Sequence, residues 1–150
     1  MNDETRQTIL RLLDQHRTMT LATLRPDGWP QATTVGYGND GLTLYFLCGL
    51  DSQKAANLAR DDRVSLTIDH DTPQVMEITG LSMAARAQVV SDPIEGQKAM
   101  QLMMQKYPQQ KSLPLPMPNF AEVRVFRVTP KVISVLDYSK GFGHTELVPC

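Results

Sequence analysis

The first apolar residues of the chain recur at the spacing of a helix. Between Glu4 and His16, apolar side chains stand at positions 9, 10, 12 and 13, which places them on one face of an α-helix. Asn2 or Asp3 precedes this segment and can cap its free N–H groups. The pattern therefore predicts an amphipathic helix at the start of the chain.

After this helix the pattern changes to the shorter period of β-strands. Two strands are predicted over Met19–Leu24 and Gln31–Tyr37, because Pro26-Asp27-Gly28 between them is a turn sequence. Asn39-Asp40-Gly41 predicts a tight hairpin into a third strand, Leu42–Cys48, whose apolar density indicates burial on both faces. We expect the three strands to form a β-meander.

The remaining residues alternate between helical and extended patterns. We predict a helix over 51–60, a strand over Arg63–Asp69, an extended stretch over Met76–Thr79, a bulge or bend at Gly80, a strand over Ala84–Val90, a helix over Pro93–Tyr107, a Pro-rich connection over 113–118, strands over Phe120–Val128 and Lys131–Tyr138, and an irregular tail from Ser139. Such a mixture predicts one mainly β domain of the α+β class over residues 1–150, an antiparallel barrel with helices packed outside it.

Composition and charge narrow the class of protein. The chain has 15 Lys+Arg, 16 Asp+Glu and 41% hydrophobic residues, a balance that excludes general disorder and argues against a broad nucleic-acid or anionic-membrane surface. The longest apolar run, Leu44–Cys48, is too short to span a bilayer, and the N-terminus lacks the features of a signal peptide. We expect a cytoplasmic protein with no nucleic-acid partner, no membrane partner and no bound metal.

The segment from Cys48 to Lys54 carries the most chemical information. A buried strand ends there, Gly49 permits a tight turn, and a helix begins whose N–H groups carry partial positive charge. Ser52 adds a hydroxyl, and Lys54 adds a cation that a bound anion would stabilise at this end of the helix. These residues alone leave two interpretations open: a phosphate site, or an ordinary helix cap beside a solvated lysine.

In their order, these segments resemble the pyridoxamine 5′-phosphate oxidase-like family of flavin-binding split barrels. The resemblance is carried by Thr20–Leu24, Asp27–Val35, Leu44–Phe46, the phosphate segment Ser52–Leu58, and Arg63–Ile68. It implies a six- to seven-stranded antiparallel split β-barrel with flanking helices. It also implies FMN as the cofactor and a homodimer with FMN in the grooves between the protomers.

The same resemblance implies which residues contact the cofactor. They are Thr33, Thr34, Val35, Cys48, Ser52, Gln53, Lys54, Tyr138, Lys140 and His144. The first three lie on the second strand and would meet the edge of the flavin ring, and Cys48 would lie close to the ribityl-phosphate. The segment from Ser52 to Lys54 would hold the phosphate, and the last three residues would reach the flavin of the other protomer.

The function implied by the resemblance is that of an FMN-dependent oxidoreductase acting on an unknown small molecule. The resemblance assigns no catalytic residue. The Arg and His with which true pyridoxamine phosphate oxidases bind their substrate are missing from the end of this chain, so we do not expect vitamin B6 oxidation. Two alternatives stay open: a non-catalytic protein that stores or senses flavin, haem or a deazaflavin, and a module that has lost its cofactor, since many relatives carry Arg where this chain has Ser52.

Overall fold

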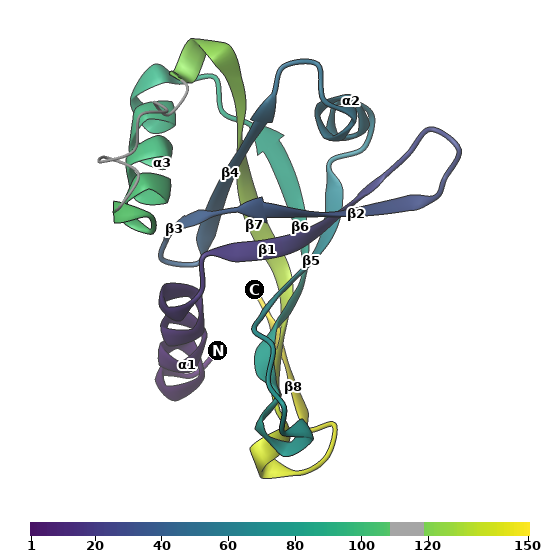
Figure 1. The fold of residues 1–150 in the computed structure, drawn as a ribbon, viewed down its shortest axis with the longest axis vertical. Helices are drawn as coiled ribbons and strands as arrows, with labels where there is room; N and C mark the ends of the chain where they lie inside the picture. The colour runs from purple at the N-terminus through teal and green to yellow at the C-terminus, as the bar shows by residue number, and fades with distance from the viewer. Residues whose placement is uncertain (109–118) are drawn as a thin grey trace.

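The computed structural model describes residues 1–108 and 119–150. In these residues one antiparallel sheet of eight strands runs in the order β2-β1-β5-β6-β7-β4-β3, with β8 added on β7. The strands are β1 Thr18–Leu24, β2 Pro30–Gly36, β3 Gly38–Asp40, β4 Thr43–Gly49, β5 Arg63–Asp69, β6 Thr79–Val89, β7 Val123–Asp137 and β8 Thr145–Pro149. The sheet curls into a half-barrel, with helices α1 (Asp3–Gln15), α2 (Gln53–Arg60) and α3 (Pro93–Gln105) around it (Figure 1). The predicted α+β fold is confirmed.

Strict alternation gives the sheet one buried face. On β5, Val64, Leu66 and Ile68 are buried and the residues between them are exposed. Because successive side chains of a strand point to opposite faces, this pattern directs every second residue into the core. The inward side chains join buried residues of α1, such as Ile9 and Leu13, in the main core cluster.

Strand β4 is buried on both faces, as its apolar density predicts. Leu44 and Phe46 belong to the main core, whereas Tyr45 belongs to a second cluster that includes Met103 of α3 and Val125 of β7. The helix α3 therefore covers the outer side of β4, and two cores share one strand.

The C-terminal end of α1 is fixed by side chains from elsewhere in the chain. The Tyr37 hydroxyl donates to the Leu13 carbonyl oxygen at 2.6 Å. Lys106 Nζ donates to the carbonyl oxygens of Leu13 and His16 at 2.7 and 2.8 Å, and lies 4.6 Å from the centre of the Tyr37 ring. These contacts satisfy carbonyl groups that a helix end leaves free, and they fix α1 against the barrel.

Residues 75–89 differ from their predicted structure. The stretch expected to be extended contains a 3₁₀ turn, η1, over Val75–Glu77. Gly80 lies in regular pairing, and the shift of register falls later, where Ala84 opposes Val132 and Ala85 opposes Pro130. Proline has no N–H to give to the ladder, so the irregularity arises opposite it.

Three further predictions were wrong. The two expected C-terminal strands form one strand, β7, after a 3₁₀ turn, η3, over Phe120–Glu122. The tail contains β8, which pairs with β7 between Val132 and Leu136. The expected meander is absent, because β4 pairs with β3 and β7 in the described residues and Tyr37, whose N–H donates to the Arg17 carbonyl oxygen at 3.1 Å, separates β2 from β3. The Pro-rich connection at 113–118 lies outside the described residues.

Candidate functional site

A buried network of side-chain hydrogen bonds joins α2 to strands β1 and β2. Asn57 of α2 is 0% exposed. Its Nδ2 donates to Thr23 Oγ1 at 3.0 Å and, at a longer 3.4 Å, to Gln31 Oε1. Its Oδ1 accepts from Gln53 Nε2 at 2.9 Å. One side chain thus connects three elements whose sequences lie far apart.

Sequence reasoning gave no role to Asn57, Thr23 or Gln31. One signal for Asn57 was present, because it follows Gln53 by four residues and the two side chains share a helix face. A polar residue on the buried face of an Ala-rich helix requires hydrogen-bond partners. The partners on β1 and β2 have no local signal, since only the folded sheet brings them to α2.

The N-terminal end of α2 has the features that anions favour. The Ser52 side chain caps the helix by accepting from the Ala55 N–H at 3.0 Å. A hydroxyl can donate while it accepts, so the Ser52 proton is available to a ligand. The first turn contains no acidic residue, and Lys54, which is partly buried, stands in it.

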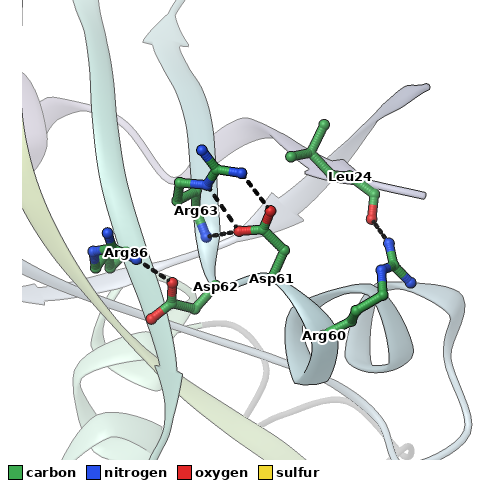
Figure 2. A network of polar contacts seen from close by, with 6 residues as sticks. All are labelled: Leu24, Arg60, Asp61, Asp62, Arg63 and Arg86. Carbon is green, nitrogen blue, oxygen red and sulfur yellow. Dashed lines mark hydrogen bonds and ion pairs between the residues drawn. The ribbon is translucent and has the colours of Figure 1, made fainter. Parts of the chain in front are cut away.

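The other end of α2 is held by exposed charged groups (Figure 2). Arg60 donates to the Leu24 carbonyl oxygen at 2.5 Å. The Arg63 guanidinium contacts both carboxylate oxygens of Asp61, at 3.0 and 2.7 Å, and this contact lowers the pKa of Asp61 to about 2. Exposed ion pairs contribute little free energy, so we assign these groups to orienting the helix rather than to stabilising it.

Strand β2 presents a buried hydroxyl that has no partner. Thr33 Oγ1 is the one side-chain nitrogen or oxygen atom in the described residues that is buried without a hydrogen bond. Thr33 and Val35 are partly buried, whereas Thr34 between them is exposed, so the three predicted ring contacts lie on two faces. In the described part of the chain β2 ends the order of strands and pairs with β1, which leaves its second edge with backbone donors and acceptors.

Cys48 ends the buried part of β4. Its side chain is 9% exposed and belongs to the main core cluster. The thiol therefore faces the interior of the barrel. A group bound outside the barrel at this point would meet the Cys48 backbone and not its sulfur.

The predicted tail residues lie at the far end of the molecule from α2. Tyr138 and Lys140 belong to a 3₁₀ turn, η4, over Tyr138–Lys140, and His144 follows it before β8. Figure 1 shows this turn, in yellow, at one end of the long sheet and α2 near the other. Phe142, two residues after this turn, is 79% exposed. Within one chain, these residues do not join the segment from Ser52 to Lys54.

Around the tail turn there is a small polar cavity. It has a volume of about 210 Å³ and its lining includes Lys140, His144, Asp137 and Glu146. The hydrogen bond from the Ser139 side chain lowers the pKa of Asp137, so this carboxylate stays charged in mild acid. The cavity is formed by β7, β8 and the start of α1, away from β2 and α2.

The described residues lack two further features that would suggest a function. No helix there is long and apolar enough to cross a membrane. No group of three or more His, Cys, Asp and Glu residues stands close enough to hold a metal ion in that part of the chain.

One family model covers most of the chain. A family model described as pyridoxamine 5′-phosphate oxidase matches residues 5–137. No curated protein matches the chain.

Several solved structures share the fold. A candidate pyridoxamine 5′-phosphate oxidase of Listeria innocua has a TM-score of 0.71 at 22% identity, over 89% of this chain and 98% of that one. A candidate 5-nitroimidazole antibiotic resistance protein of Bacteroides thetaiotaomicron has a TM-score of 0.71 at 18% identity, over 90% and 84%. A heme binding protein of Mycobacterium smegmatis has a TM-score of 0.75 at 20% identity, over 97% of this chain and 57% of that one. At these identities the likeness concerns the fold alone.

Proposed function

Because this chain belongs to the pyridoxamine 5′-phosphate oxidase family, we propose that it binds FMN and is a flavin-dependent oxidoreductase for a small molecule. The observation that carries this proposal is the buried, unpartnered hydroxyl of Thr33 on the end strand of the sheet. An unpaired buried hydroxyl costs free energy, and a ligand that bonds to it recovers that cost. The cofactor would carry the hydride or the electrons, and the protein would bind and orient it.

The residues present fit the two ends of FMN. A phosphate dianion matches the start of α2, where the Ser52 hydroxyl, the free N–H groups and Lys54 combine. The polar edge of a flavin ring matches the Thr33 hydroxyl and the second edge of β2. Asn57 and Gln31 connect these two places, which supports one extended ligand rather than two separate ones.

FMN supplies hydride or electron transfer when it is bound. In the chain itself, Lys54 and Ser52 would bind the phosphate, and Thr33 would orient the ring. We assign no general acid or base, and this set of residues suits acceptors that can take their protons from water rather than from a protein acid, such as quinones or nitro compounds.

The proposal includes a homodimer. The turn η4 and the residues that follow it lie at the opposite end of the sheet from α2 (Figure 1), so Tyr138, Lys140 and His144 can contact the same cofactor only from a second copy. Phe142 and Leu147, at 79% and 68% exposure, give this end of the molecule apolar surface that a partner can cover.

The test of the phosphate assignment is Lys54→Ala. Loss of one charge-assisted contact, about 1.5–3 kcal/mol, should weaken FMN binding by about 10- to 150-fold. Titrations that follow flavin fluorescence would measure the dissociation constant, with riboflavin, which has no phosphate, as the control ligand whose affinity should change little. Lys98→Ala on α3 is the matched control variant. An unchanged dissociation constant for FMN would remove Lys54 from the site.

A further inference from the structure

We propose that Asn57 is a positioning residue, which fixes the distance and angle between the phosphate end of the site on α2 and the ring end on β2. This inference rests on the proposed FMN function. It concerns a residue that touches neither end of the ligand but hydrogen bonds to both supporting elements.

The packing of α2 needs such a contact. Ala55 and Leu58 are buried, at 7% and 5% exposure, and attach the helix to the barrel. Apolar contacts of this kind are not directional, so they allow a short helix to rotate or slide. Hydrogen bonds depend steeply on distance and angle. Those of Asn57 give α2 directional contacts on its buried side, in addition to the exposed one from Arg60 to Leu24 at its C-terminal end. Because Asn57 lies one turn from Lys54 and Arg60 lies at the far end of the helix, the Asn57 contacts determine where Lys54 is placed.

The pairing of β1 with β2 links the Asn57 contacts to the ring end of the site. Thr23 and Gln31, the two partners of the Asn57 amide nitrogen, are paired directly in the ladder of β1 and β2. Thr33 follows Gln31 by two residues, so both side chains are on the same face, about 7 Å apart along the strand. The unpartnered hydroxyl of Thr33 is thus the next side chain on that face after the one that Asn57 contacts.

The coupling follows from this arrangement. The ribityl chain joins the phosphate of FMN to its ring and limits how far apart they can lie, so both ends bind well only when their supports lie within the reach of that chain and face it. A variant that lacks the Asn57 contacts should keep each half of the site and lose their alignment. The benefit of Lys54 should then fall, because its ammonium group is no longer placed for a ligand whose ring is bound on β2.

The experiment is a double-mutant cycle between Lys54→Ala and the pair Thr23→Val/Asn57→Leu. The pair replaces the buried Asn57 and Thr23 by apolar groups of similar shape, which is close to neutral for folding. The exposed Gln53 and the partly buried Gln31 can turn to water. Dissociation constants for FMN and riboflavin, and unfolding by urea, are measured for every variant. Ala59→Gly, an exposed change that weakens α2 without touching the network, is the structural control.

We expect the pair to weaken FMN binding by about tenfold and Lys54→Ala to cost at least about threefold less in the pair than in the wild type. Equal losses in the two backgrounds would overturn the positioning role, and so would an equal loss of FMN affinity in Ala59→Gly. A wild-type protein with no affinity for FMN would instead refute the proposed function, and this inference with it.

Discussion

Replacing Thr33 by valine removes the unpartnered hydroxyl and keeps the shape of the side chain. A buried hydroxyl without a partner costs about 1–3 kcal/mol. The oxygen is buried while the residue is partly exposed, so the lower end applies. We therefore expect Thr33→Val to stabilise the protein without ligand by about 1 kcal/mol, which raises its melting temperature by roughly 2–4 °C for a chain of this length.

The same change should weaken FMN binding. If the hydroxyl bonds to the flavin, its loss removes about 0.5–1.5 kcal/mol, equivalent to a dissociation constant about 2- to 13-fold larger. The two effects have opposite signs. If Thr33 served folding alone, its replacement would lower the stability of the protein or leave its affinity for FMN unchanged.

Thermal and urea unfolding of the flavin-free protein, with FMN titration, would measure both effects. Thr20→Val is the matched control, because Thr20 is exposed on the neighbouring strand and its replacement should change stability by less than about 0.5 kcal/mol. Lower stability of Thr33→Val relative to this control would show that the hydroxyl already has a partner, such as an ordered water, and would refute the reasoning.

Two further predictions concern the framework of the site. Tyr37→Phe should cost about 1 kcal/mol at pH 8, because the Leu13 carbonyl oxygen still accepts from Lys106. Burial, with a smaller contribution from Asp14, raises the pKa of Tyr37 above 10.0, so its contribution is complete below pH 10 and is lost as pH rises further. Urea unfolding from pH 8 to 11 should show the wild type losing its advantage over Tyr37→Phe by up to about 1.4 kcal/mol per pH unit, and a constant difference would contradict this. Gly38→Ala should destabilise the fold by about 1–3 kcal/mol, because its Cβ would lie 2.7 Å from the Met103 backbone nitrogen. Gly49→Ala, whose Cβ meets no atom within 4 Å, should change the midpoint of unfolding little, and equal losses in the two alanine variants would refute the close packing of α3 on β3.

Local patterns predicted most of the fold. The helix cap, for which the sequence offered Asn2 or Asp3, and the strand over Arg63–Asp69 depend on neighbouring residues; the structure has Asn2 as the cap and confirms the strand. The errors lie where distant parts of the chain decide. Two strands were predicted, ending at Val128 and beginning at Lys131, but β6 pairs along both segments and keeps β7 continuous through an irregular register at Pro130. The glycine-rich tail suggested an irregular end, whereas the long edge of β7 gives β8 a partner.

In the candidate site, too, residues with a local sequence pattern could be predicted and residues joined by long-range contacts could not. Ser52 and Lys54 can be proposed from the sequence because a strand, a turn and a helix start follow one another there. The links from Asn57 to Thr23 and Gln31 span 34 and 26 residues, and no local pattern contains them. Whether Thr33 Oγ1 has a hydrogen-bond partner depends on every neighbour of that atom in the fold. The sequence could therefore suggest Thr33 but not that its hydroxyl lacks a partner.

The most direct test of FMN binding is an absorption spectrum of the purified protein after incubation with excess FMN and removal of the unbound flavin. Our account predicts retained flavin bands that correspond to about one FMN per chain, as expected for tight binding at a single site. A colourless protein after this treatment, or one that instead acquires a haem absorption band in a parallel incubation with haem, would contradict it.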